Sequence, residues 1–338
     1  MKRSLLPILL LLLLCCCCSP DREYVQLSGP AQGGSYLVKL CARDASCTPG
    51  ELKQGVDSIL LAIDNSVSGY NPSSVLSRFN AGEKVEPDSV FRELYLRSRD
   101  LWERSGGTVD VAAGPLFDIW GFGFRDGSLP SDSLVQAVSA RCGMALLPSC
   151  IDSLVSCRPE GTVLNFNCIA QGYSSDCIAG YLRARGVRDF LVNVGGEIVC
   201  QGLNPKGENW AVGIDRPVDG NLFPGNDMEG VYRPGTEPCG IVTSGNYRKF
   251  YVIDGRKYSH TIDPRSGRPV NHSLLSATVV APDATLADAM ATCCMVLGLE
   301  GASRLIEESP ELEACLIYDD GQGRLKEWCS PGFVLSER

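Results

Sequence analysis

Apolar residues recur every three or four positions in four segments of the chain, a spacing that predicts amphipathic helices. The segments are residues 51–70, 87–107, 131–143 and 169–186. The second begins at Pro87-Asp88 and ends at Gly106-Gly107, and the fourth ends at Gly186. These are ordinary helix start and stop signals, so we expect one buried face on each helix.

Other segments alternate between apolar and polar residues or are apolar throughout, which predicts strands. They are residues 33–40, 189–202, 210–217, 239–264, 274–282 and 314–328. Asp254-Gly255 marks a hairpin turn, and residues 219–235 are rich in Gly, Pro and Asn, which predicts a surface loop. A helix is expected from about Thr285 to Leu297, and one more before the last hairpin. Because strands and helices intermix, we predict an α+β or mixed α/β fold in one compact, two-lobed unit.

The N-terminal stretch MKRSLLPILLLLLLCCCCSPD has a basic start and a short apolar run, Leu5 to Leu14. This run is too short to favour a membrane span and is typical of a signal peptide. Cleavage and acylation at one of Cys15 to Cys18 would make a bacterial lipoprotein; a plain signal anchor is the alternative. We therefore predict a signal peptide with a lipoprotein cysteine cluster over 1–18, a tether over 19–30 and the folded domain over 31–330.

Net charge and cysteine spacing exclude some classes of function. The net charge of −9 over 338 residues argues against nucleic-acid binding, which needs clustered cations. Of seventeen cysteines, thirteen lie beyond the four of the leader, and no CxxC pair suggests a zinc site. Export would permit disulfides, with Cys41–Cys47 and a pair among Cys142, Cys150 and Cys157 as candidates. An anaerobic habitat would leave all of them as thiols.

Asp288 and Thr292 are four residues apart on a predicted helix and so share one face. A carboxylate and a hydroxyl are hard oxygen ligands that suit Mg²⁺, although a solvated polar stripe has the same spacing. Asp110 follows a Gly-Gly helix end and precedes Trp120 and Phe122. This segment would suit a cofactor pocket or, equally, a helix cap followed by core aromatics.

Two further segments carry polar groups. Asn165, Asn167 and Gln171 surround a predicted helix start, where free N–H groups bind anions or the asparagines cap the helix. His260 precedes the turn in HTIDPRSGRP. A histidine has the right pKa range for a general base, but a hairpin histidine without chemistry is the common alternative.

Taken together, six ordered motifs resemble the FAD:protein FMN transferase (ApbE-type flavin transferase) family. They are GGSY, VSGYNPSSVLSRFN, GGTVDVAAGPLFDIWGFG, NFNCIAQGYSSD, NVGGE, and TSGNYRKF with HTIDPRSGRPV and ADAMAT. The resemblance runs from about Gly33 to about Trp328 and implies a two-lobed, T-fold-like flavin transferase domain.

The resemblance implies Mg²⁺-dependent transfer of FMN from FAD to a Thr or Ser hydroxyl of an exported acceptor, with release of AMP. The acceptors it implies are FMN-binding domains of sodium-pumping quinone reductases and Rnf-type complexes. A lipid anchor on a bacterial membrane, facing the periplasm, fits this setting. The alternatives are a Mg²⁺-dependent FAD pyrophosphatase that yields FMN and AMP, and a flavin-binding lipoprotein without chemistry.

Matched residue by residue, the family pattern implies a metal site and a flavin site. The metal ligands are the side chains of Asp288 and Thr292 and the backbone carbonyl of Cys168. The implied FAD contacts are Gln32, Tyr70, Thr108, Val109, Asp110, Asn165, Gln171 and His260. His260 is the implied proton acceptor or diphosphate contact, and these roles stay open.

The chain departs from the family pattern at several positions. Gln32 and Gly34 stand where Met and Thr are frequent, Asn165 replaces a frequent Asp, and Gln171 replaces a frequent Lys. Losing the Lys removes a cation near a diphosphate. Asn donates and accepts hydrogen bonds but is no base, so the departures are compatible with FAD binding and put the identity of the proton acceptor in question.

Overall fold

The computed structural model describes residues 23–123, 129–218, 220–221, 225–247, 250–253 and 256–336. The predicted leader and the Asp254-Gly255 turn lie outside these residues.

An antiparallel sheet of eight strands forms the centre of the molecule. In spatial order the strands are β1 (Tyr24–Ala31), β2 (Gly34–Cys41), β3 (Phe190–Val194), β4 (Glu197–Gln201), β7 (Cys239–Gly245), β12 (Leu274–Ala281), β13 (Glu313–Asp319) and β14 (Leu325–Cys329). All neighbouring pairs are antiparallel. Side chains therefore alternate between the two faces of the sheet, and each face has its own core.

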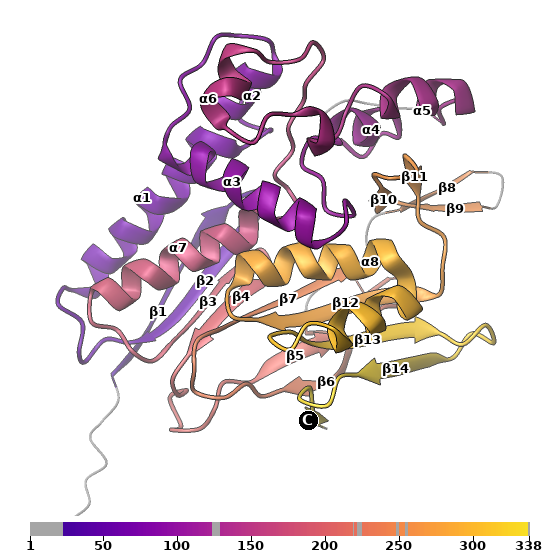
Figure 1. Cartoon of the computed structure of the whole chain (residues 1–338). Helices are drawn as coiled ribbons and strands as arrows, with labels where there is room; N and C mark the ends of the chain where they lie inside the picture. The colour runs from indigo at the N-terminus through magenta and orange to yellow at the C-terminus, as the bar shows by residue number, and fades with distance from the viewer. Residues whose placement is uncertain are drawn as a thin grey trace, which may run out of the picture.

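Helices α7 (Ala170–Ala184) and α8 (Ala284–Glu307) cover one face of the sheet, with α1 (Pro49–Val67) beside α7 (Figure 1). The backbone of α8 bends at Gly298, where φ is 70°, so the two helices expected around residue 297 are joined into one bent element. Among the described residues α8 is the one helix long and apolar enough to span a membrane. It packs on β7 and β12 of the sheet with most of its residues buried, so in this structure it is a core helix.

A second group of helices lies above α7 and α8 in Figure 1. It contains α2 (Val75–Asn80), α3 (Ser89–Arg104), α4 (Gly114–Ile119), α5 (Asp132–Ser139), a 3₁₀ turn (Met144–Leu146) and α6 (Ile151–Ser156). Its buried side chains, such as Phe79 and Phe91, belong to the same core as Val38 of the sheet and Met290 of α8. One continuous core therefore joins this group of helices to the sheet.

The other face of the sheet packs against a second, three-stranded sheet in the order β15-β6-β5. Its strands are β5 (Val212–Asp215), β6 (Met228–Tyr232) and β15 (Leu335–Ser336). Two small hairpins, β8 (Phe250–Ile253) with β9 (Arg256–Ser259) and β10 (Ile262–Asp263) with β11 (Arg268–Pro269), complete the chain.

The structure confirms a mixed α+β fold and most of the predicted elements. Helices α1, α3 and α5 begin at the side-chain caps Thr48, Asp88 and Ser131. Two expectations were wrong. Most of the expected tether is strand β1, and the expected loop at 219–235 contains strand β6.

Two residues explain why β1 is a strand although a tether was expected there. Pro30 argues against a central strand, but β1 is at the edge of the sheet, where a missing N–H is tolerated. Gly29 makes room for the ring of Tyr36 on β2, because a Cβ there would lie 2.8 Å from Cε1 of the ring. The pairing partner, rather than the local pattern, thus makes this segment a strand.

Candidate active site

The close contact between α7 and α8 fixes Asp288. A Cβ on Gly172 of α7 would lie 2.3 Å from the carbonyl oxygen of Ala284, so the helices approach as closely as glycine allows. The Gly172 N–H donates to Oδ2 of Asp288 over 3.1 Å. Asp176 of α7 accepts hydrogen bonds from the N–H groups of Ala284 and Thr285, both at 2.8 Å, and so caps the start of α8.

Asp288 shares its surroundings with a second acid, Glu197, at the start of β4. Burial raises the pKa of Asp288 well above its usual value, and the negative charge of Glu197 raises it further. Burial likewise raises the pKa of Glu197 to about 7. Buried, mutually repelling carboxyl groups favour a bound cation or a retained proton.

Glu197 is a site residue that the sequence did not predict. In the sequence, NVGGE appeared only as one of the six family motifs, with no role for its acid. In the structure the motif spans the β3–β4 turn, and the backbone carbonyl of Glu197 accepts a hydrogen bond from Ser175 of α7 over 2.7 Å. Its buried Oε2 has no hydrogen-bond partner among the described residues. The one available signal was an acid directly after a Gly-Gly turn.

Other predicted residues lie near the start of α7. Burial, with a contribution from the charge of Asp288, raises the pKa of the Cys168 thiol to about 12, so the sulfur stays protonated. The side chain of Gln171 lies against Gly195 of the β3–β4 turn, where its Nε2 is 2.0 Å from the position a Cβ would take. Gln32 donates to Oγ of Ser174 over 2.5 Å, and its Oε1 is buried without a partner among the described residues.

Thr292 lies one turn after Asp288 on α8 and is half-buried. The structure therefore brings Cys168, Gln171 and Asp288 together and adds Glu197. Carboxylate, hydroxyl and backbone carbonyl oxygens are the donors that hard divalent cations take. The unpartnered Oε2 of Glu197 is an acceptor of the kind that such a cation would satisfy.

The predicted stretch Thr108 to Asp110 packs against α8 and the 3₁₀ turn. Oγ1 of Thr108 is 2.9 Å from Sγ of Cys293 on α8, and both Thr108 and Val109 are buried. The carboxylate of Asp110 accepts from the N–H groups of Ala112 at 2.8 Å and Met144 at 3.0 Å. Burial raises the pKa of Asp110. The Asp110 carboxylate thus joins the segment after α3 to the start of the 3₁₀ turn, and Thr108 joins the same segment to α8.

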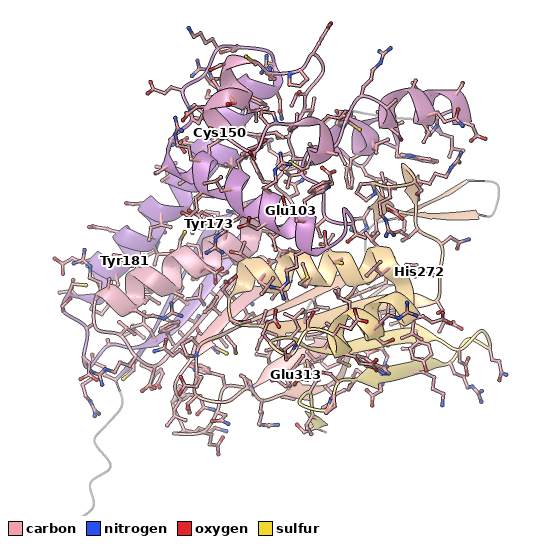
Figure 2. All side chains as sticks on the ribbon, viewed as in Figure 1. Glu103, Cys150, Tyr173, Tyr181, His272 and Glu313 are labelled. Carbon is pink, nitrogen blue, oxygen red and sulfur yellow. The ribbon has the colours of Figure 1, made fainter. Side chains whose placement is uncertain are left out.

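Tyr70 and Asn165 lie on the loops that face each other before α2 and α7. The Tyr70 side chain is 73% exposed, and its hydroxyl accepts a hydrogen bond from Nδ2 of Asn167 over 3.3 Å. Oδ1 of Asn165 accepts from the N–H of Asn167 over 2.9 Å, so Asn165 shapes its own loop. Nearby, Tyr173 of α7 (Figure 2) joins α7 to α3 by donating to Glu93 over 2.8 Å.

His260 is held by its two neighbours. The hydroxyls of Ser259 and Thr261 donate to Oδ1 of Asn246, over 2.5 and 2.6 Å, and all three side chains are buried. His260 itself is half-buried, with its ring 6.4 Å from the ring of Phe122 at an interplanar angle of 67°. The sequence did not identify Asn246 as the acceptor of these two hydrogen bonds, although it stands in the TSGNY motif.

The comparisons with known proteins agree with these motifs. The model of the ApbE family matches residues 33–316. The chain belongs to this family. All six motifs fall inside the matched range.

Curated ApbE-family relatives match the chain over nearly its whole length. The FAD:protein FMN transferase of Vibrio cholerae is 33% identical over 317 residues, which is 92% of each chain. That of Escherichia coli K12 is 32% identical over 328 residues, 94% of this chain and 91% of the relative.

Solved ApbE structures have the same fold. The flavin transferase ApbE of Vibrio cholerae superposes with a TM-score of 0.78 at 30% identity, covering 91% of this chain and 97% of the other. The apo form of the Pseudomonas stutzeri flavinyl transferase ApbE gives 0.76 at 30% identity, over 91% and 95% of the chains.

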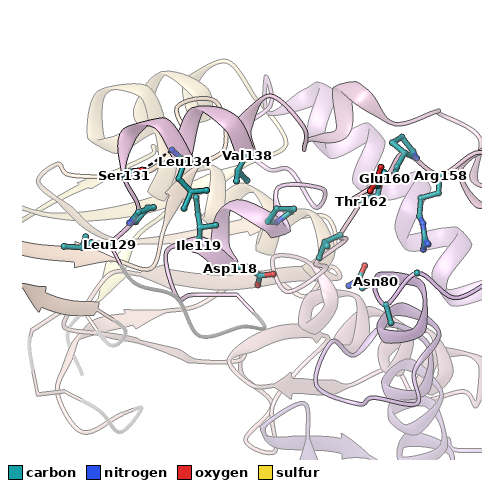
Figure 3. A pocket seen from close by; sticks show the side chains of 17 residues that line it. Asn80, Asp118, Ile119, Leu129, Ser131, Leu134, Val138, Arg158, Glu160 and Thr162 are labelled. Atoms are coloured by element: carbon teal, nitrogen blue, oxygen red, sulfur yellow. Dashed lines mark hydrogen bonds between the residues drawn. The ribbon is translucent and has the colours of Figure 1, made fainter.

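One cleft of this ApbE-family chain lies apart from the predicted site. It has a volume of about 1020 Å³ and lies between the end of α2, helices α4 and α5, and the loop at 158–163 (Figure 3). Asn80, Asp118, Leu134 and Arg158 are among its lining residues, and none of the predicted metal or flavin residues is. We therefore centre the site on Asp288 and Glu197.

Proposed function

We propose that the chain is a magnesium-dependent FAD:protein FMN transferase that moves FMN from FAD to a Thr or Ser hydroxyl of an exported acceptor protein and releases AMP. The observation that carries the proposal is a pair of acids: Asp288, buried where α7 and α8 meet, and Glu197, half-buried at the start of β4 with its Oε2 atom buried. The named activity of the curated relatives supports the reaction.

Magnesium would be held by Asp288, Thr292 and the backbone carbonyl of Cys168, with Glu197 beside them. The unpartnered Oε2 of Glu197 and the raised pKa values of both acids support a cation at this place. Bound magnesium would neutralise charge on the diphosphate oxygens of FAD. Gln171 and Asn165 would add neutral hydrogen bonds in place of the cation and the acid frequent in the family.

The transfer needs one bond to form and one to break. The acceptor hydroxyl oxygen attacks the FMN-side phosphorus of FAD, the bond from that phosphorus to the AMP oxygen breaks, and the hydroxyl proton must be taken up. His260 is our proposed acceptor of this proton, because its neighbours are fixed by Asn246. Gln32, Tyr70 and the stretch Thr108 to Asp110 complete the proposed flavin-binding set.

The acceptor we propose is an FMN-binding domain of a membrane redox complex, of the quinone-reductase or Rnf type. We also propose that the chain is a lipoprotein on a bacterial membrane, facing the periplasm. The basic and apolar leader with Cys15 to Cys18 supports this location.

The direct test incubates the protein with FAD, Mg²⁺ and an acceptor domain that carries the target Thr or Ser. We expect a fluorescent acceptor band that survives denaturing electrophoresis, and no band when the target residue is replaced by Ala. Free FMN with an unlabelled acceptor would instead identify a pyrophosphatase, and unchanged FAD a binding protein.

His260→Ala should lower the transfer rate about 100-fold or more while FAD still binds, since general acid–base groups contribute on the order of 10²–10⁴-fold. The other histidine, His272, provides the control. Its Nε2 lies 2.9 Å from the carbonyl oxygen of Met295, so His272→Ala should change the thermal midpoint and leave the pH profile of transfer intact. Near-normal turnover of His260→Ala would contradict the proton-acceptor role.

A further inference from the structure

Four of the described cysteines face one another in two pairs on the sheet. Cys200 of β4 is directly opposite Cys239 of β7, and Cys315 of β13 is directly opposite Cys329 of β14. The Sγ atoms of the first pair are 3.7 Å apart, and those of the second lie within 4.8 Å. All four belong to the core under the three-stranded sheet, on the face away from α7 and α8.

Residues directly opposite each other on antiparallel strands have Cα atoms about 4.5–5.5 Å apart. A disulfide spans Cα separations of about 4.4–6.8 Å. Both pairs therefore suit a covalent bridge without movement of the backbone. In the structure all thirteen described cysteines are thiols, including the pairs that the sequence offered as disulfide candidates.

We propose that Cys200–Cys239 and Cys315–Cys329 are the two disulfides of the exported protein, formed by exchange with a disulfide donor. The proposal rests on export, which gives the chain an oxidising compartment. The proposal does not depend on the flavin chemistry. Oxidation of the purified protein tests the two bridges independently of export and of FMN transfer.

Each pair consists of one buried cysteine and one partly accessible cysteine. Cys200 and Cys315 are fully buried, whereas Cys239 and Cys329 are half-buried. The hydrogen bond from its partner holds the pKa of Cys239, and likewise that of Cys329, below the usual value of a thiol. In each pair the accessible sulfur is therefore the better nucleophile.

This asymmetry sets the order of exchange. The thiolate of Cys239 attacks one sulfur of the donor, forms a mixed disulfide and releases a first thiolate. Cys200 then loses its proton and attacks Sγ of Cys239, which releases the second thiolate. Two protein thiols give up two electrons and two protons, and the donor becomes two thiols. Cys329 and Cys315 react in the same way.

Each bridge would add a covalent link between two neighbouring strands of the sheet, and the β4–β7 ladder that the first would reinforce pairs only three residues on each strand. Residues 200–239 are a 40-residue excursion that carries β5 and β6, and the first bridge closes its base. The second bridge fastens β14, the last strand of the sheet, to β13. A loop closed in this way loses entropy mainly in the unfolded chain, so the oxidised protein should be more stable.

The first experiment needs no substitution. The full chain is purified reduced, oxidised with glutathione disulfide, denatured and counted for free thiols. We expect four fewer thiols than in the reduced sample and, in a non-reduced digest, peptides that link Cys200 to Cys239 and Cys315 to Cys329. An unchanged thiol count, or other linkages, would overturn the proposal.

The second experiment compares thermal midpoints in the oxidised and reduced states. Oxidation should raise the midpoint by roughly 5–10 °C, and Cys239→Ser and Cys329→Ser should each remove part of this rise. The exposed Cys157, changed to Ser, is the matched control and should keep all of it. Glu327 also lies within 4.8 Å of the second pair. Zinc bound there in stoichiometric amount, with no Cys315–Cys329 peptide, would overturn the second bridge.

Discussion

At the scale of single residues, the proposed chemistry depends on how costly it is to ionise Asp288 and Glu197. Burial raises the pKa of both, so a bound divalent cation would offset a penalty that the folded protein otherwise carries. A cation site of this kind should be visible in stability as well as in activity, because a ligand that binds only the folded state stabilises it.

We expect Asp288→Asn to lower FMN transfer by about 100-fold or more, since it removes the charged oxygen from the proposed metal site. It should also abolish the rise in thermal midpoint that Mg²⁺ gives the wild-type protein. Transfer rates and thermal unfolding, each with and without Mg²⁺, measure both effects. The exposed Asp100, changed to Asn, is the control and should behave like wild type. Magnesium-stimulated turnover in Asp288→Asn would refute the metal site.

Glu197 makes a separate prediction about pH. Burial raises its pKa from the usual 4.5 to about 7. Between these values the folded protein holds a proton that the unfolded chain has lost, so stability falls as pH rises through this range. Without bound metal, the free energy of unfolding should be about 3 kcal/mol lower above pH 7 than at pH 4.5, because each unit by which the pKa is raised corresponds to about 1.4 kcal/mol.

In EDTA, Glu197→Gln should therefore be more stable than wild type at pH 8 and no more stable at pH 4.5. Urea unfolding across this range measures the difference. Glu103, which is exposed on α3 (Figure 2), supplies the control substitution Glu103→Gln. A wild-type protein whose stability rose between pH 5 and pH 7 in EDTA, with Glu197→Gln unchanged from it, would contradict the burial of this carboxyl group.

The sequence predicted Asp288, Cys168 and Gln171 because each stands in a recognisable motif. The structure places them at one end of α7, and their roles stay predictions. Glu197 could not be found this way. Its chemistry comes from burial beside Asp288, which depends on β4 lying under α7 and α8, and no local pattern encodes that approach. Asn246 was missed for the same reason, since its partners Ser259 and Thr261 are thirteen and fifteen residues away.

At the scale of elements, the distance between α7 and α8 is set by Gly172. A Cβ at this position would lie 2.3 Å from the carbonyl oxygen of Ala284 and 3.0 Å from Cβ of Asp288. Gly172→Ala must therefore push the helices apart and move Asp288, at a cost of about 1–3 kcal/mol, typical of overpacking. Activity should fall with the stability.

Gly180 is a matched control on the same helix. A Cβ there would meet nothing within 4 Å, so Gly180→Ala should stabilise the protein by about 0.5–1 kcal/mol through helix propensity alone. Urea unfolding and FMN transfer of both variants give the comparison. If the two substitutions had the same effect, the close approach of α7 and α8 would not be what positions Asp288.

The elements also show what a local pattern can and cannot predict. Helices α1, α3 and α5 were predictable because the apolar spacing that forms their buried faces lies within each segment, and the caps Thr48, Asp88 and Ser131 stand at or just before its start. Strands β1 and β6 were not, because each is a strand through hydrogen bonds with a partner outside its own segment, β2 for β1 and β5 for β6. The pairing of Cys200 with Cys239 is likewise a matter of register between β4 and β7.

At the scale of the whole molecule, contacts between segments far apart in sequence hold the second group of helices, α2 to α6, against α7, α8 and the β10–β11 hairpin. Tyr173 donates to Glu93, the hydroxyl of Thr108 lies beside the sulfur of Cys293, and Nε1 of Trp120 donates to the carbonyl of Gly267 over 2.8 Å. The predicted flavin residues from the helices are thus fixed relative to the predicted metal residues on α7 and α8. The six sequence motifs suggested that these residues lie close together, but they did not show which contacts join the segments.

The whole molecule also determines how far the proposed anchor lets it reach. Strand β1 begins at Tyr24, so residues 19–22 and Glu23 are all that separate it from the cysteine cluster. Five residues span at most about 18 Å, which would keep the domain close to the membrane and to a membrane-bound acceptor.

Replacing Cys15 to Cys18 together by Ser should therefore abolish labelling with a fatty-acid analogue and release the protein from the membrane fraction. Flavinylation of an acceptor in the membrane should fall, whereas that of the same acceptor domain in solution should not change, because the described fold begins after the cysteines. Restoring one cysteine at a time identifies the acylated residue. If the four-serine protein stayed in the membrane fraction, the leader would be acting as an uncleaved signal anchor, and acylation would not be what holds the enzyme there.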